Sequence, residues 1–276
     1  MTSPRSSSPA RSADRVPVAT DRLRQITVTA SEVLSLLGPL IGAGIIGSRV
    51  EESPGGDLSS DATLVAPGGP AFSIWSVIYL GLFAYTIWQW LPSRTTDTRL
   101  RATGWLASLS MVLNAAWLVV TQQGWIWASV VVIIALLVTL VLLMLRLARH
   151  GARHGAGESI VVDGTFGLYA GWVCVATAAN IAAALASSGV ATTGTAPEWA
   201  TAALVLFLAG SLTFLQSRIG GRWAVAAAAS WGLAWISVAR LTDQPQSVVV
   251  AVAAGVAAVL VLGVTAIFRA PGARSR

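Results

Sequence analysis

Residues 125–147 read WIWASVVVIIALLVTLVLLMLRL, and this stretch decides the fold class. It carries no charge before Arg146, and as an α-helix it would be about 35 Å long, enough to cross the hydrocarbon core of a bilayer. A second stretch of the same character occupies residues 246–268. Because a chain in hydrocarbon must satisfy its backbone hydrogen bonds internally, both runs indicate transmembrane helices.

The composition extends this interpretation to the whole chain of 276 residues. Hydrophobic residues make up 55% of it, charged residues only 11%, and the mean hydropathy is +0.70. A typical soluble domain has about 25% charged residues, so an ordinary soluble protein and a disordered chain are both excluded. Apolar runs of about 20 residues also exclude a β-barrel. We therefore predict an all-α fold, a polytopic transmembrane helix bundle.

Eight spans can be distinguished along the chain. We place them at 26–48, 71–91, 102–121, 125–147, 165–187, 199–216, 222–239 and 246–268. Before them, residues 1–25 are rich in Ser, Pro and Arg and are predicted to form a disordered cytoplasmic tail, and residues 269–276 form a second tail.

The distribution of arginine predicts the orientation in the membrane. All 18 basic residues are arginines, and with eight spans only Arg49 and Arg240 fall on the side opposite the N-terminus. By the positive-inside rule, both termini are expected to be cytoplasmic in a multi-pass protein of the cell membrane. Because the arginines lie in tails and short loops, they read as topology signals, and no nucleic-acid partner is expected.

The twelve tryptophans divide into two groups. Seven lie near the ends of predicted spans, where an aromatic belt explains them: Trp88, Trp90, Trp105, Trp125, Trp127, Trp199 and Trp223. Five lie further inside: Trp75, Trp117, Trp172, Trp231 and Trp235.

Aromatic and amide side chains converge in the outer half of the predicted bundle. Counted from the span ends, Trp75 and Trp117 lie about 6 Å deep, and Tyr79 and Asn114 about 10–12 Å deep, on matching helix faces. Asn180 has the same depth as Asn114, whereas Trp172 falls in the inner half. We expect the amide oxygen one turn below the indoles to accept an indole N–H.

Two questions about this region stay open at the level of sequence. The amides of Asn114 and Asn180 either join helices by hydrogen bonds or line a pocket, or do both. The longest outer connection, residues 49–70, either folds over these side chains or is a loose acidic linker.

Other polar and small residues suggest structural roles. Glu32 is expected to extend to the membrane interface. The pairs Gly38-x-x-x-Gly42 and Gly167-x-x-x-Gly171 would allow helices to approach closely. His150 and His154 share an inner loop with no further ligand, so no metal site is predicted.

Three motifs occur in order: PGGPAFSIWSVIYLG at 67–81, LNAAW at 113–117 and YAGWVCVATAANIAA at 169–183. Together they resemble the extended branch of the TspO/MBR family, the tryptophan-rich sensory proteins related to the mitochondrial translocator or peripheral benzodiazepine receptor. The resemblance covers residues 71–187 well and the first span loosely. It implies a five-helix core over 26–187 and three additional helices over 188–268.

The resemblance also implies a binding function. Family members bind tetrapyrroles, and animal relatives bind cholesterol and synthetic aromatic ligands, in a pocket beneath the loop that joins the first two helices. The implied ligand-binding residues are Trp75, Tyr79, Asn114, Trp117, Trp172 and Asn180, with Trp172 resting on the resemblance alone. Where short members carry a Trp-x-Pro-Pro-type stretch, this loop has no tryptophan and ends Pro67-Gly68-Gly69-Pro70.

The leading hypothesis is a sensor, carrier or modulator that binds a planar hydrophobic ligand, such as a porphyrin or haem. The alternative is a secondary transporter of a small hydrophobic molecule, although no internal repeat relates residues 1–138 to 139–276. An enzyme is least favoured, because the candidate pocket has no histidine, cysteine pair or carboxylate. No catalytic residue or resident cofactor is predicted; the expected partners are membrane lipid and this ligand, and the oligomeric state is left open.

Overall fold

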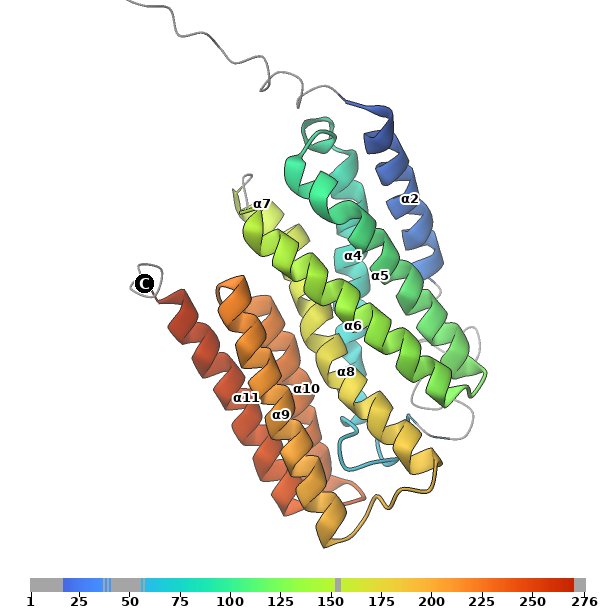
Figure 1. Cartoon of the computed structure of the whole chain (residues 1–276), viewed down its shortest axis with the longest axis vertical. Helices are drawn as coiled ribbons and strands as arrows, with labels where there is room; N and C mark the ends of the chain where they lie inside the picture. The colour runs from blue at the N-terminus through green and yellow to red at the C-terminus, as the bar shows by residue number, and fades with distance from the viewer. Residues whose placement is uncertain are drawn as a thin grey trace, which may run out of the picture.

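The computed structural model is a bundle of long helices (Figure 1). It describes residues 17–36, 38, 40, 56, 58–151 and 155–270. The long helices are α2 (Ala19–Ser35), α4 (Ile74–Trp90), α5 (Thr98–Gln122), α6 (Ile126–Arg149), α8 (Thr165–Ser187), α9 (Thr195–Ile219), α10 (Trp223–Thr242) and α11 (Val248–Arg269). Short helical segments join them: η2 (Gly69–Ser73), η3 (Pro92–Arg94), α7 (Gly155–Glu158) and the π-helical turn η4 (Ser159–Gly164).

The predicted polytopic helical bundle is confirmed. Seven of the described helices, α4 to α6 and α8 to α11, are long and apolar enough to cross a membrane, and their ends agree with the predicted spans to within four residues. The first predicted span, 26–48, is described only in its first half, as part of α2. Its Pro39 and Gly42 lie outside the described residues.

Helix α2 begins earlier than predicted, so the assignment of residues 1–25 to a disordered tail is wrong from Ala19 onward. Gln25 donates to the carbonyl oxygen of Gln89 at 2.7 Å, and Arg101 pairs with Asp21 at 2.7 Å. The Arg101 guanidinium also lowers the pKa of the Asp21 carboxyl. These contacts tie the start of α2 to its neighbours; the first 16 residues lie outside the described part of the chain.

Glu32 does not extend to the interface, which corrects a second prediction. Its side chain is only 3% exposed, and it accepts a hydrogen bond from the Ser35 hydroxyl at 2.8 Å. A carboxyl on the packed face of α2 cannot reach water by extending along its own helix, because α4 and α5 cover that face.

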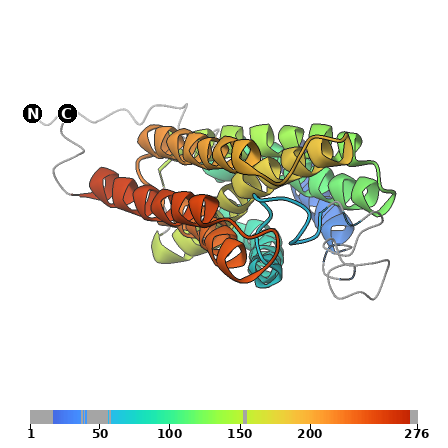
Figure 2. The ribbon, with the colours of Figure 1, turned by 90° about the horizontal axis from the view of Figure 1, so that it is seen from below.

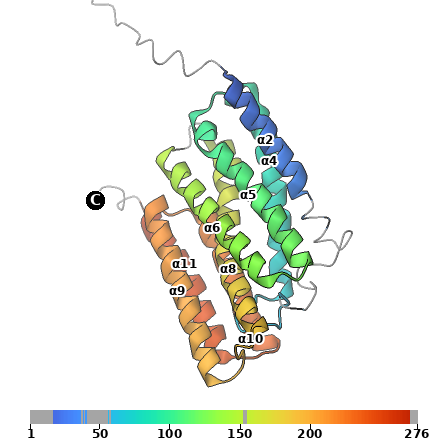
Figure 3. The ribbon, with the colours of Figure 1, turned by 45° about the vertical axis from the view of Figure 1, so that its right-hand side comes forward.

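Helix α8 lies at the centre of the bundle and is the most buried of the seven apolar helices (Figures 1 and 3). It contacts α4, α6 and α10, while α2 packs on α5 and α4, and α5 packs on α6. On the other side, α9 and α11 pack together and α10 joins them to α8. The first five long helices therefore meet the last three mainly along the line between α8 and α10.

Glycines permit the close approach of α8 and α10. A Cβ atom added to Gly171 would lie 2.2 Å from the carbonyl oxygen of Val225, and one added to Gly167 would lie 2.7 Å from the Ala224 Cβ. The predicted close approach at this pair is thus confirmed, with α10 as the partner. Gly38 packs in the same way against the Tyr79 hydroxyl.

The two ends of the bundle differ in character. Helix α2 begins and α11 ends at the same end, which also carries η3, α7 and the turn between α9 and α10; we call it the arginine-rich end (Figure 1). The opposite end, the loop end, carries the segment 58–73 between α2 and α4. Viewed from below, this segment lies among the ends of α4, α8 and α10 (Figure 2).

Candidate functional site

Trp75, in the first turn of α4, lies at the centre of an aromatic cluster near the loop end. Its ring stacks on Tyr79 of the same helix and on Trp117 of α5, with centroids 5.5 and 6.4 Å away. Tyr169 and Trp172 of α8 meet it edge-on at 5.9 and 6.3 Å. We call these five side chains and Phe72, which packs edge-on against Trp172, the ring cluster.

The structure brings Trp75 and Trp117 together from facing helices, as predicted from their depth. The depth estimate is wrong for Trp172, which joins the cluster although its position in the span suggested the inner half of the bilayer. The estimate counts from a span that begins at residue 165, whereas the helix is continuous from Gly155 to Ser187, so Trp172 lies near its middle. The resemblance implies a ligand-binding role for Trp172 together with the other candidates, and its ring lies 6.3 Å from that of Trp75.

Asn114 joins two helices. Its Nδ2 donates to the Tyr79 hydroxyl at 3.0 Å and so links α5 to α4. Within the described residues, its Oδ1 accepts no hydrogen bond, and the indole N–H of Trp117 has no acceptor. The predicted bond between the amide oxygen and that indole is therefore wrong, because the amide points its NH₂ group at the phenol instead.

Asn180 has both of the roles that the sequence left open. Its amide pairs with the Ser129 hydroxyl of α6, with Nδ2 and Oδ1 lying 3.0 and 3.2 Å from Oγ. It also lines a cavity beside the ring cluster. Asn114, in contrast, does not line this cavity, so the two amides differ in position although they share a depth.

The cavity is small and lies beneath residues 58–68, which we call the loop segment. It measures about 30 Å³ and is lined by Leu58, Ser59, Thr63, Ala66, Pro67, Phe72, Trp75, Trp117, Trp172, Ala176, Ala179 and Asn180. That is room for about one water molecule. The described part of the connection 49–70 thus folds over the rings and is not a loose linker, while residues 49–55 and 57 lie outside the described residues.

Helix α10 holds this loop segment in place. Arg240, fully buried near the end of α10, donates to the carbonyl oxygens of Ser60 at 2.8 Å and Thr63 at 3.0 Å. Its third acceptor is the carbonyl oxygen of Pro245 at 2.9 Å. Three carbonyl dipoles replace the water that a buried guanidinium would otherwise need.

Two tryptophans of α10 contribute further contacts to the loop segment and to η2, which follows it. The indole N–H of Trp231 donates to the carbonyl oxygen of Ala71 at 3.0 Å, and the N–H of Gly68 donates to the carbonyl oxygen of Trp235 at 3.3 Å. The sequence predicts no role for either tryptophan and marks Arg240 only as a topology signal. Their position away from the aromatic belt was the one available hint that they pack against another element.

The sequence model of a family described as TSPO-like protein matches residues 34–267. The matched segment runs from the end of α2 almost to the end of α11, so it includes the last three helices as well as the ring cluster. Comparison with curated proteins and with solved structures gave no match.

Proposed function

The chain belongs to the TSPO-like protein family, and from this membership we propose that it binds a planar hydrophobic ligand at the ring cluster, as a sensor, carrier or modulator in the membrane. The proposed ligand-binding residues are Trp75, Tyr79, Asn114, Trp117, Trp172 and Asn180. The observation that carries this proposal is the near-parallel pair of Trp75 and Trp117, contributed by two different helices with an interplanar angle of 27°.

The geometry of this pair suits a flat guest. At 6.4 Å, its centroid separation is near the long end of the range for aromatic pairs, about 4.5–7 Å. A flat ring held between two indoles needs about 7 Å between their planes, twice a contact distance of about 3.5 Å. Helices α4 and α5 would have to move apart to open such a slot, and Tyr169 and Trp172 would close its side.

Unsatisfied polar atoms around the cluster supply polar contacts for the ligand. The indole N–H groups of Trp117 and Trp172 are buried without an acceptor among the described residues. A buried donor without a partner costs about 1–3 kcal/mol. A ligand that places carboxylate or other acceptor oxygens beside these indoles recovers that cost, which favours an acidic tetrapyrrole over a pure hydrocarbon.

Entry of such a ligand requires the loop segment to move. The cavity of about 30 Å³ is far below the about 300–1,000 Å³ of ordinary ligand sites. We propose that the ligand displaces segment 58–67 and so weakens its hydrogen bonds to α10. This couples occupancy of the ring cluster to the last three helices, which suits a sensor or modulator better than a transporter.

We further propose the cell membrane as the location, with both termini cytoplasmic and the loop end outside. The arginine distribution supports this orientation. The start of α2 and the end of α11 share one end of the bundle, as an even number of spans requires (Figure 1).

The direct test is a titration of the purified, detergent-solubilised protein with protoporphyrin and with haem. Tryptophan fluorescence and the Soret band report binding. We expect saturable quenching together with a Soret shift, because the rings that quench are the rings that stack. Linear, non-saturating quenching without a Soret shift would reject the ring cluster as a tetrapyrrole site.

A further inference from the structure

A second, larger cavity of about 970 Å³ lies at the arginine-rich end of the bundle. Helices α4 and α10 both pack against α8, and residues of all three helices line this cavity. Arg99, Arg222 and Arg269 line it as well. It shares no lining residue with the cavity at the ring cluster, and its volume is within the range of ligand sites, about 300–1,000 Å³.

Two carboxylates hold two of these arginines. Arg99 donates to Glu158 at 2.8 Å and to Asp163 at 2.5 Å, and Arg222 donates to the same oxygen of Asp163. Asp163 lies in the π-helical turn η4 before α8, between the predicted spans 125–147 and 165–187. The turn therefore delivers one carboxylate to arginines from two different parts of the bundle.

The described residues that line the cavity carry more positive than negative charge. Three arginines line the cavity, and Asp163 is the one carboxylate among the described lining residues; Arg269, at the end of α11, forms no ion pair with any described residue. The Nε–H groups of Arg99 and Arg222 are buried without an acceptor in the described part of the chain. Guanidinium groups bind phosphate oxygens through parallel N–H donors, so this excess suits a phosphate.

The remaining wall of the cavity is apolar and open to the outside. Val77 and Leu80 of α4 are 54% and 68% exposed, and Ile160 of η4 is 70% exposed. From Ala84 to Val77 the wall extends about 10 Å along α4, away from the arginines and toward the loop end. A cationic end that continues into an apolar wall is complementary to an amphiphile with an anionic head.

We propose that this cavity binds an anionic phospholipid. Its phosphate contacts Arg222 and Arg269, and one acyl chain lies along Val77 and Leu80. Such a lipid touches α4 and the start of α8 on one side and α10 and α11 on the other. It therefore stabilises the junction between the first five long helices and the last three.

The test measures the midpoint of thermal unfolding of the full chain in a neutral detergent. Phosphatidylglycerol, phosphatidylcholine with the same acyl chains, and inorganic phosphate are titrated separately. We expect only phosphatidylglycerol to raise the midpoint strongly, since ligands that bind the folded state alone stabilise it. Arg269→Gln should raise the half-saturating concentration of phosphatidylglycerol about fivefold, the effect of one arginine at a lipid headgroup.

Arg22→Gln is the matched control, because it removes the same charge at the same end of the bundle, at an exposed position of α2 that lies outside the cavity. It should leave the lipid response unchanged. Arg269 is preferred to Arg222 for the test because its loss breaks no ion pair of the described residues. The proposal would be overturned if phosphatidylcholine or inorganic phosphate raised the midpoint as much as phosphatidylglycerol does. It would also be overturned if Arg22→Gln and Arg269→Gln weakened the response to phosphatidylglycerol equally.

Discussion

Arg240 of α10 donates a hydrogen bond of 2.8 Å to the backbone carbonyl of Ser60, across most of the sequence. The guanidinium is fully buried and forms no ion pair with the described residues, among which its hydrogen-bond acceptors are backbone carbonyls. One of the last three helices therefore controls the segment that covers the ring cluster. The additional helices are part of the candidate site and not an appendage to it.

Replacing Arg240 should loosen the loop segment. A hydrogen bond to a charged group contributes about 1.5–3 kcal/mol, so Arg240→Met should accelerate amide hydrogen exchange in residues 59–68 about tenfold or more. Exchange in α5 and α6, which lie away from this contact, should stay unchanged. Arg22→Met, at an exposed arginine, serves as the control. Unchanged exchange over 59–68 in Arg240→Met would show that the guanidinium does not hold the loop.

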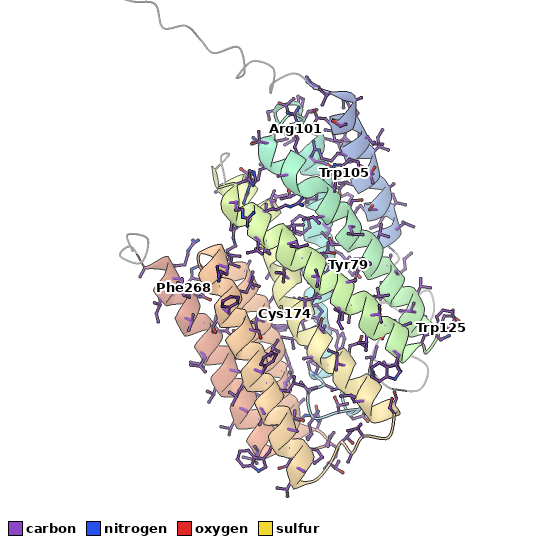
Figure 4. The ribbon with its side chains drawn as sticks, in the orientation of Figure 1. Tyr79, Arg101, Trp105, Trp125, Cys174 and Phe268 are labelled. Atoms are coloured by element: carbon purple, nitrogen blue, oxygen red, sulfur yellow. The ribbon has the colours of Figure 1, made fainter. Side chains whose placement is uncertain are left out.

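The stacked indoles should dominate ligand affinity. Trp75→Ala and Trp117→Ala each remove a stacking partner, and each should weaken protoporphyrin binding about tenfold or more, or roughly 1.4 kcal/mol. Trp125 is 61% exposed and lies at the edge of the bundle, away from Tyr79 in the interior, so Trp125→Ala should have little effect (Figure 4). Fluorescence and Soret titrations measure all three variants. A similar loss in all three would place binding outside the ring cluster.

The amide of Asn180 should contribute to stability through its partner, the Ser129 hydroxyl. Asn180→Leu and Ser129→Ala should each lower the free energy of unfolding by about 1 kcal/mol. The double variant should lower it by less than the sum of the two, because both changes remove the same interaction. Thermal or denaturant unfolding in detergent gives these values. Strictly additive effects would mean that the bond between α6 and α8 contributes nothing.

Close packing of α8 on α10 should make Gly171 intolerant of a side chain. Gly171→Ala brings a Cβ against the backbone of Val225, and we expect a loss of about 1–3 kcal/mol from overpacking. Gly210→Ala is the matched control, since nothing lies within 4 Å of its added Cβ. There the higher helix propensity of alanine should leave stability unchanged or raise it by up to about 1 kcal/mol. Equal unfolding midpoints for the two variants would contradict the contact.

Topology can be tested with reporter fusions. A reporter after Arg218, at the end of α9, and a reporter at the C-terminus should both be active in the cytoplasm. A reporter inserted at Gln244, between α10 and α11, should be active outside. An external C-terminus would reject the proposed orientation and the even number of spans.

The sequence by itself determined the membrane-spanning architecture. A bilayer imposes a minimum length on every apolar helix and leaves no alternative way to satisfy the backbone, so spans such as 125–147 and 165–187 could be located within a few residues. The same local logic placed Trp75 and Trp117 on facing helices, because helical periodicity and distance from the span end are properties of single segments.

Only the tertiary structure decided which side chains meet. The packing of α8 against α4 brought Trp172 to Trp75, and the amide of Asn114 donates to the Tyr79 hydroxyl and does not accept from an indole. The burial of Arg240 beneath the loop, and of Glu158 beside Arg99, depends on segments far apart in the chain. Hydropathy is a property of a single segment and indicates whether that segment can lie in lipid. The partner of a polar side chain depends on which neighbouring helix lies against it. The crossing angles and offsets of the helices, which decide this, are set by the packing of the whole bundle.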